Sequence, residues 1–155
     1  MQLLKVNIES DRSMRFAEAG IWLLIILWSY AVFAKLADFP LYQKQMRQQV
    51  FSPAVSAYLV YLILFLESLA MLSLMFMATR RTGLILSLLL LIGFTIYIIL
   101  IMGGYFPKVP CSCGGLISKM SWKNHLYFNL IFMVMNVVCL YYSPQKERRF
   151  QAQQR

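Results

Sequence analysis

The sequence predicts an all-α fold class, an integral membrane four-helix bundle with a short interfacial helix in the first outer loop. Hydrophobic residues make up 60% of the 155 residues and charged residues only 14%, whereas soluble domains are about half apolar and a quarter charged. A helical crossing needs about 20 apolar residues, so the chain has room for about four spans. The formal charge of +9 would favour nucleic acid in a soluble protein, but here it fits basic loops kept on the cytoplasmic side. We therefore expect the lipid bilayer, and no nucleic acid, as a partner.

Four apolar segments define the expected single domain over residues 1–155. The spans lie at about 16–36, 54–78, 83–104 and 121–142, and a basic cytoplasmic tail follows at 143–155. No charged residue lies between Glu18 and Lys35 in the first span. A cleavable signal peptide is the alternative interpretation of this segment, but its apolar run is longer than a typical signal core.

The other three spans carry clearer signals. The second is interrupted only by Glu67 and opens with Ser52-Pro53, a capping residue followed by a proline that the first helical turn tolerates. The third has no charge from Thr82 to Pro107. The fourth begins at Ser121-Trp122, with Ser as the cap and Trp at headgroup depth, and we expect Ser143-Pro144 to end it.

Between the first two spans, the segment Leu41 to Phe51 has an amphipathic pattern. Tyr42, Met46 and Val50 recur every four residues among Lys, Arg and Gln. This spacing predicts a short helix in the membrane interface. A lid over the second outer loop and a solvated connector are equally consistent with the pattern.

Charge placement predicts the orientation. An even number of spans puts both termini on one side, and that side holds nine of the 15 Lys and Arg residues against six on the other. Arg80-Arg81 in the tight second loop is the kind of placement that the positive-inside rule weights most. We therefore expect cytoplasmic termini, with residues 36–53 and 104–121 facing outward.

The second outer loop holds a pair of cysteines, Cys111 and Cys113, separated by one residue. Two extended residues span up to about 7 Å while disulfide Cα atoms lie about 4.4–6.8 Å apart, so a bridge here would be strained. Strain raises the reduction potential and suits thiol exchange better than a structural role. We favour redox exchange in an oxidising compartment. A metal site completed by His125 and a static disulfide are the alternatives, and we assign no metal ligand.

Polar residues share one face of the fourth span. His125, Asn129, Asn136 and Cys139 fall on the same side of the helix, and polar groups in a span generally face the bundle interior. A histidine near a cysteine lowers the thiol pKa, which makes His125 a candidate catalytic residue, with an ordinary interfacial residue as the equal alternative. We expect Cys139 to be a packing residue.

Glu67 lies in the middle of the second span, where a carboxyl group is costly unless it is protonated or partnered. One interpretation is a proton-exchanging residue that binds a quinone together with Asn129 and Asn136. The slightly favoured alternative is a protonated Glu67 that is hydrogen-bonded to Asn136 or Tyr97 and fixes helix packing.

Lys35 and Asp38, three residues apart at the outer end of the first span, are expected to form an exposed ion pair of little energetic value. Lys35 is also a candidate catalytic residue, because an ammonium group can stabilise a thiolate at Cys111 or Cys113.

An ordered set of segments resembles the MauE family, four-helix membrane proteins related to DoxX. The set comprises Tyr30 to Asp38, Glu67, Pro110 to Gly115 and Ser121 to Asn129. The resemblance implies a redox-associated protein of the bacterial inner membrane, of a family named for a role in maturing methylamine dehydrogenase, whose small subunit is rich in disulfides. A broader analogy to vitamin K epoxide reductase implies electron transfer from thiols to quinone. This chain departs from such enzymes in its one-residue cysteine gap and its lack of a second outer cysteine pair.

The predicted function is therefore thiol–disulfide redox chemistry at the outer, periplasmic face. Cys111 and Cys113 assist disulfide formation or maturation of an exported protein with cysteines, and electrons leave to a quinone or to a thioredoxin-like protein. The alternatives are a non-enzymatic assembly protein for a partner subunit and a small metal carrier that uses Cys111, Cys113 and His125. Nothing in the sequence predicts a site for methylamine.

Overall fold

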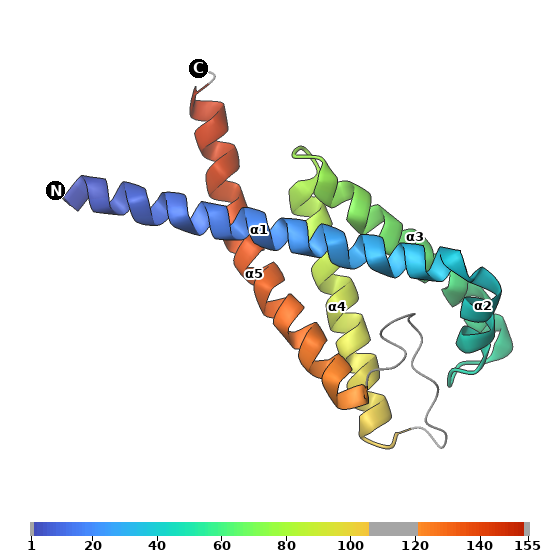
Figure 1. The fold of residues 1–155 in the computed structure, drawn as a ribbon. Coiled ribbons are helices and arrows are strands. Elements are labelled where there is room, and N and C mark those ends of the chain that lie inside the picture. The colour runs from blue at the N-terminus through green and yellow to red at the C-terminus, as the bar shows by residue number, and fades with distance from the viewer. Residues whose placement is uncertain (1, 106–120, 154–155) are drawn as a thin grey trace.

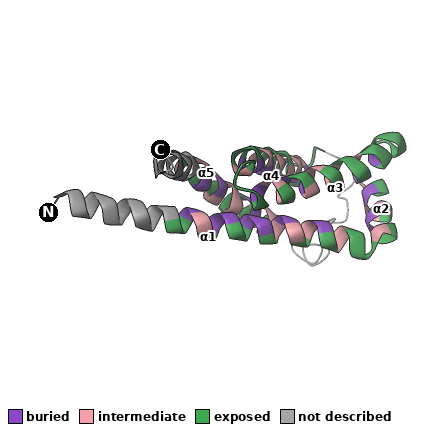
Figure 2. Ribbon diagram, turned by 90° about the horizontal axis from the view of Figure 1, so that it is seen from above, coloured by how far each residue is buried: buried purple, intermediate pink, exposed green. Residues whose placement is uncertain are grey.

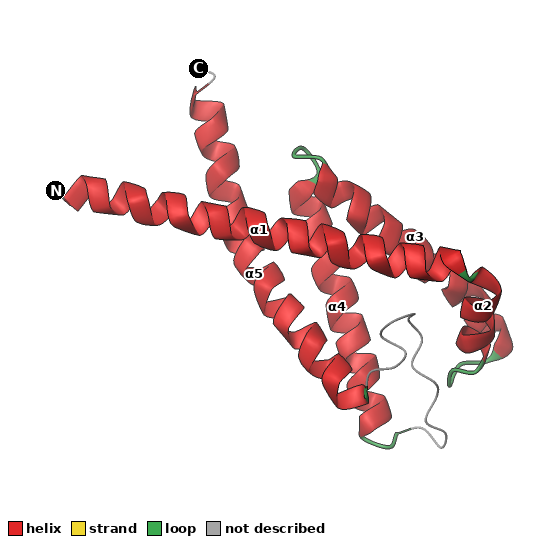
Figure 3. Cartoon of the chain, viewed as in Figure 1, coloured by secondary structure: helices red, strands yellow, loops and turns green. Residues whose placement is uncertain are grey.

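The computed structural model describes the backbone of residues 2–105 and 121–153, and the side chains of residues 15–105 and 121–142. Within this part the chain forms five helices and no strand (Figure 3). The helices are α1 Gln2–Ala37, α2 Phe39–Arg47, α3 Pro53–Met75, α4 Arg80–Met102 and α5 Trp122–Gln153. Four segments are long and apolar enough to cross a membrane, namely Arg15–Ala37, Pro53–Met75, Arg80–Met102 and Trp122–Tyr142. The predicted all-α class with four spans is confirmed.

The four long helices pack in a ring, in which α1 and α4 each contact both α3 and α5. The pair α1 and α3 spreads apart from the pair α4 and α5 toward the ends of α1 and α4 (Figure 1). We call this side the α2 end, because it holds α2, the start of α3, the end of α4 and the start of α5. A cavity lies between the two pairs at this end.

Capping residues start two of the helices as predicted. The Ser52 hydroxyl accepts a hydrogen bond from the Val55 amide at 3.4 Å, and Pro53 occupies the first turn of α3. The Ser121 hydroxyl accepts from the Asn124 amide at 3.4 Å at the start of α5. Each contact satisfies one of the amide groups that a helix leaves unpaired at its first turn.

The fourth long helix extends beyond its predicted end. Helix α5 continues through Ser143-Pro144 to Gln153, so the prediction that this dipeptide ends the helix is wrong. A proline removes one backbone hydrogen bond and crowds the preceding turn, but the turns on both sides of Pro144 retain helical geometry. Helix α1 likewise begins at Gln2, well before the predicted first span.

The core lies between the inward faces of the long helices (Figure 2). Its buried residues are Ile21, Leu24, Ile25, Trp28, Ala70, Leu74, Leu84, Leu91 and Cys139. A Cβ on Gly20 would lie 2.5 Å from the Cys139 sulfur, so α1 and α5 approach closely there. The Cys139 thiol donates to the Ala17 carbonyl at 3.4 Å. Cys139 is thus a packing residue, as the sequence predicts.

Helix α2 packs across the first half of α3. Asp38 caps it, since its carboxylate accepts from the Leu41 amide at 3.0 Å. Tyr42 and Met46 are buried against Val60, and the Tyr42 hydroxyl donates to the Val60 carbonyl at 3.2 Å. The predicted amphipathic helix is confirmed, although it ends at Arg47 and leaves Val50 in the following turn.

Candidate functional site

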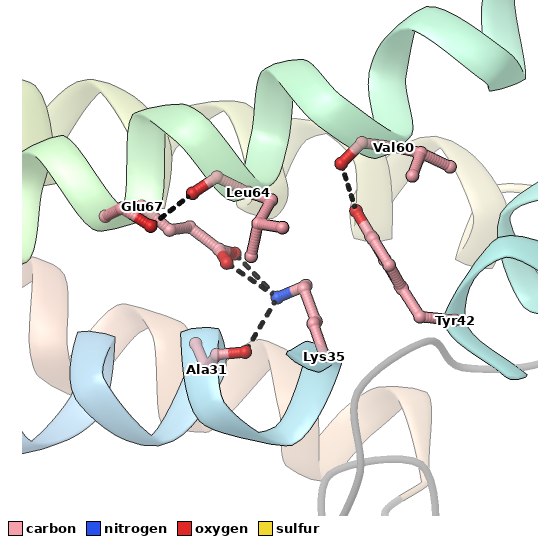
Figure 4. Close-up of polar contacts among 7 residues, drawn as sticks. Ala31, Lys35, Tyr42, Val60, Leu64 and Glu67 are labelled. Atoms are coloured by element: carbon pink, nitrogen blue, oxygen red, sulfur yellow. Dashed lines mark hydrogen bonds and ion pairs between the residues drawn. The ribbon is translucent and has the colours of Figure 1, made fainter. Parts of the chain in front are cut away.

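A buried ion pair joins α1 to α3 near the α2 end. The Lys35 ammonium donates to both carboxylate oxygens of Glu67 at 2.8 Å, and the two side chains are 11% and 1% exposed. The ammonium also donates to the Ala31 carbonyl at 3.4 Å and lies 5.7 Å from the centroid of the Tyr42 ring, a distance suited to a cation–π contact. Figure 4 shows Lys35 and Glu67 reaching toward each other from neighbouring helices. The pair satisfies both charges internally.

This pair corrects two predictions. The expected exposed pair of Lys35 with Asp38 is wrong, because Lys35 binds Glu67 while Asp38 caps α2. The expected bond of Glu67 to Asn136 or Tyr97 is also wrong. A buried carboxylate without a counter-ion costs several kcal/mol, whereas an exposed ion pair gains about 1 kcal/mol at most. Pairing Lys35 with the buried Glu67 therefore lowers the free energy more than pairing it with the exposed Asp38.

A cavity of about 300 Å³ lies beside the ion pair, between the two helix pairs. Its walls are mostly apolar, and the aromatic rings among them belong to Trp28, Tyr30, Tyr42, Phe51, Phe94, Tyr97, Trp122 and Phe128. The described polar side chains that reach it, apart from tyrosine and tryptophan, are those of Lys35, Gln49, Glu67, His125 and Asn129. The volume is at the lower end of the range for small-molecule sites, which have a similar mix of apolar walls and few polar groups.

The turn between α2 and α3 closes one side of the cavity. The Tyr97 hydroxyl of α4 donates to the Gln49 side chain, and the Phe51 ring stacks on the Tyr97 ring with centroids 5.8 Å apart. These contacts tie the α2–α3 connection to α4 across the site. The predicted contact of the α2 segment with the second outer loop stays a prediction, because residues 106–120 lie outside the described part of the chain.

His125 and Asn129 bring unused hydrogen-bonding capacity to the cavity. Asn129 is 4% exposed, and its Nδ2 has no hydrogen-bond partner among the described residues. The buried Nδ1 of His125 likewise has none there. An unsatisfied buried polar group costs about 1–3 kcal/mol. Both residues line the cavity, so a molecule bound there is one way to satisfy these two atoms.

Asn136, one of the predicted site residues, occupies a different place. Its amide nitrogen donates to the Leu84 carbonyl at 3.1 Å, and its amide oxygen accepts from the Ser87 hydroxyl at 2.7 Å. The Ser87 hydroxyl also accepts a hydrogen bond from the Trp28 indole at 2.8 Å. This chain of bonds joins α1, α4 and α5. Asn136 is not among the described residues that line the cavity, in contrast to Glu67 and Asn129.

Sequence reasoning missed Ser87 and Trp28, the other two side chains in this chain of bonds. Ser87 is the one hydroxyl side chain between Thr82 and Thr95 in an otherwise apolar span, which is a readable signal for a buried hydrogen bond. Trp28 carries no such signal, since an indole in a span can equally lie at the interface.

The two cysteines predicted to react, Cys111 and Cys113, lie outside the described residues. The loop that carries them follows the end of α4 at Met102 and precedes α5, which begins at Trp122, three residues before His125. In the described part of the chain, no group of three or more His, Cys, Asp or Glu residues is arranged to hold a metal ion. The predicted metal alternative uses Cys111 and Cys113, so it stays a prediction.

Comparison with known protein families identifies the chain. The family model described as methylamine utilisation protein MauE matches residues 13–142. The chain belongs to the MauE family. The match spans the four candidate membrane segments, so this MauE-family protein is a multi-pass membrane protein of a family linked to methylamine utilisation. It also includes Lys35, Glu67, His125, Asn129 and the cysteine loop. No curated protein and no solved structure matches the chain.

Proposed function

We propose that this MauE-family protein carries out thiol–disulfide exchange for an exported partner through Cys111 and Cys113. A partner thiolate attacks one sulfur of the loop disulfide, the sulfur–sulfur bond breaks, and a mixed disulfide forms. A second partner thiol then displaces the loop sulfur, which leaves the partner oxidised and the loop as a dithiol. The dithiol returns to the disulfide when two electrons and two protons pass to an acceptor, either a membrane quinone or the disulfide of a thioredoxin-like protein.

One juxtaposition carries the proposal. The loop with the cysteines joins α4 to α5, and these two helices contribute Tyr97, His125 and Asn129 to the wall of the cavity. Both helices that the loop joins therefore border the cavity, which supports electron transfer from the cysteines to an acceptor held there. The strained spacing of the two cysteines favours exchange with other thiols over a structural bridge.

We assign different tasks to the two candidate catalytic residues. His125 is close in sequence to the loop, four residues after Ser121, so it is the candidate to stabilise a thiolate. The Lys35 ammonium is bonded to both oxygens of Glu67, so we assign it to holding Glu67 in place rather than to a cysteine.

The proposed location is the bacterial inner membrane, with cytoplasmic termini and the cysteine pair on the periplasmic face. The basic pair Arg80-Arg81 at the start of α4 supports this orientation. A periplasmic loop lies in an oxidising compartment that allows disulfides to persist.

Thiol trapping in intact cells tests the proposal. A Cys139→Ala background leaves the loop cysteines as the only thiols in the chain, and a membrane-impermeant maleimide that adds mass reports their redox state and their side of the membrane. We expect a mixture of dithiol and disulfide, and a mixed disulfide with a partner when Cys111 or Cys113 alone is changed to Ser. Cysteines that stay fully reduced, or partner disulfides that do not respond to either change, would overturn it.

The same variants separate the assembly protein and metal carrier alternatives. An assembly protein keeps its function when both cysteines are changed to Ser and loses it when the Leu41 to Phe51 segment is altered. A metal carrier purifies with stoichiometric metal, which the Cys111→Ser variant loses.

A further inference from the structure

We infer that the cavity binds the ring of a membrane quinone, with Asn129 donating a hydrogen bond to one of its carbonyl oxygens. The binding site itself is independent of the cysteines, whereas a role for the quinone as electron acceptor rests on the proposed function. Three properties of the cavity select this class of ligand.

The first property is the absence of a free charge among the described residues that line the cavity. The charged side chains there are Lys35 and Glu67, and they neutralise each other at 2.8 Å. An ionised ligand would be buried without a counter-ion, which is strongly unfavourable. The ligand that fits is therefore uncharged.

The second property is the pattern of unpaired polar atoms. Asn129 Nδ2 can only donate, and His125 Nδ1 can donate or accept depending on its tautomer. A ligand that satisfies both needs at least one acceptor oxygen that remains uncharged in the membrane. A carbonyl group meets this requirement, whereas a pure hydrocarbon leaves both atoms unsatisfied.

The third property is the nature of the walls. Aromatic rings from α1, α4 and α5 face the cavity, including Trp28, Phe94 and Phe128, and aromatic side chains favour stacked or tilted contact with planar rings. A volume of about 300 Å³ suits a ring with small substituents and not a whole lipid. A long apolar tail must therefore leave the cavity and lie in the bilayer.

The structure also provides an opening for such a tail. Gly93 of α4 lines the cavity and is exposed, and a Cβ added there would meet no atom within 4 Å. Tyr30 of α1 also lines the cavity while 38% exposed. The wall is thus open to the membrane-facing surface at these positions, which gives a ligand dissolved in the bilayer a lateral entrance.

Tryptophan fluorescence of the full-length protein in detergent micelles tests the inference. The chain has three tryptophans, of which Trp28 and Trp122 line the cavity and Trp22 lies exposed on α1. In a Trp22→Phe background, decylubiquinone should quench the fluorescence saturably at one molecule per protein. Decylbenzene, with the same tail and no carbonyl groups, should neither quench saturably nor compete.

Two variants address the ligand contact and the entrance separately. Asn129→Leu keeps the branched skeleton of the side chain but replaces the amide with two methyl groups, which removes the donor, and it should weaken decylubiquinone binding about three- to tenfold, the equivalent of one hydrogen bond. Gly93→Leu should abolish saturable quenching, because its side chain fills the opening without meeting neighbouring atoms. Ile96→Phe, which adds bulk on the exposed face of α4 outside the cavity, is the control and should bind normally. Equal responses to decylubiquinone and decylbenzene, or normal binding in both site variants, would overturn the inference.

The experiment distinguishes the inference from the proposed function. Changing Cys111 and Cys113 to Ser should leave decylubiquinone binding unchanged. Saturable binding in a protein whose cysteines never cycle would sustain the site and reject the redox function. Cycling cysteines without saturable binding would reject the quinone site and favour a thioredoxin-like acceptor.

Discussion

Removal of the Lys35 ammonium should destabilise the bundle much more than removal of its partner. At 2.8 Å and an effective dielectric constant of about 20, the attraction between the two charges is about 6 kcal/mol before the cost of desolvation. When one partner of a buried pair is removed, the remaining charge is left uncompensated, at a typical cost of about 3–5 kcal/mol. We expect this loss of unfolding free energy for Lys35→Met, because Glu67 is 1% exposed and lies in the middle of α3.

The reverse change should cost less. After Glu67→Met, Lys35 remains near the end of α1, where a long flexible side chain can move its charge toward the interface, so we expect a loss of about 1–3 kcal/mol. The double variant Lys35→Met/Glu67→Met should regain most of the stability, since apolar side chains of similar volume often replace a buried pair without loss. A result close to the sum of the single changes would show that the two side chains are not coupled.

The assay is unfolding of the purified protein by SDS in mixed micelles, followed by far-ultraviolet circular dichroism. Lys44→Met is the matched control, because Lys44 is exposed on α2 and its removal should change stability by less than about 0.5 kcal/mol. If Lys35→Met behaves like Lys44→Met, the argument that the pair neutralises a buried charge is refuted.

Three further predictions concern packing, and thermal unfolding monitored by circular dichroism checks each of them. Gly83→Ala should destabilise by about 1–3 kcal/mol, because its Cβ would lie 2.8 Å from a backbone nitrogen of α3, whereas Gly93→Ala meets nothing within 4 Å and should be nearly neutral. Ser87→Ala should lower the unfolding free energy by about 1–3 kcal/mol, because it leaves buried donors and acceptors unpaired. Ser87→Thr keeps the hydroxyl but adds a methyl group to a closely packed position, so an unchanged stability of this variant would contradict the close packing. Gly20→Ala should destabilise through a contact of 2.5 Å with the Cys139 sulfur, and Cys139→Ala should relieve that part of the loss.

The fold was predictable because its signals are local. A span is recognised from a run of apolar residues, and Ser52 and Ser121 cap α3 and α5 through amides three residues ahead. The inward face of α5 was predictable for the same reason, since the spacing of Asn129, Asn136 and Cys139 fixes their common side and all three are buried. The end of α5 was not predictable, because the hydrogen bond lost at one proline is small compared with those made in the helical turns on both sides of it.

The partner of Glu67 was not predictable from the same rules, because it depends on how far one helix is shifted along another. Lys35 lies two residues from the end of α1, whereas Glu67 lies 14 residues, or about 21 Å, from the start of α3. If α1 and α3 are assumed to cross the membrane at the same depth, the two residues therefore lie apart. They meet because the first turns of α3 extend past α1 and pack against α2 instead, as the contact of Tyr42 with Val60 requires.

The neutrality of the cavity also bears on the kind of chemistry that it can support. Oxidation of a dithiol releases two electrons and two protons, and reduction of a quinone to a quinol takes up the same number, so each molecule is uncharged before and after the transfer. A low-dielectric cavity whose lysine and glutamate already neutralise each other imposes little electrostatic penalty on either state. An ionic product would face the full cost of a buried charge. Breaking the ion pair should therefore reduce the binding free energy of an uncharged quinone less than it reduces the unfolding free energy of the protein. This difference would distinguish a structural role of Lys35 from a direct contact between Lys35 and the ligand.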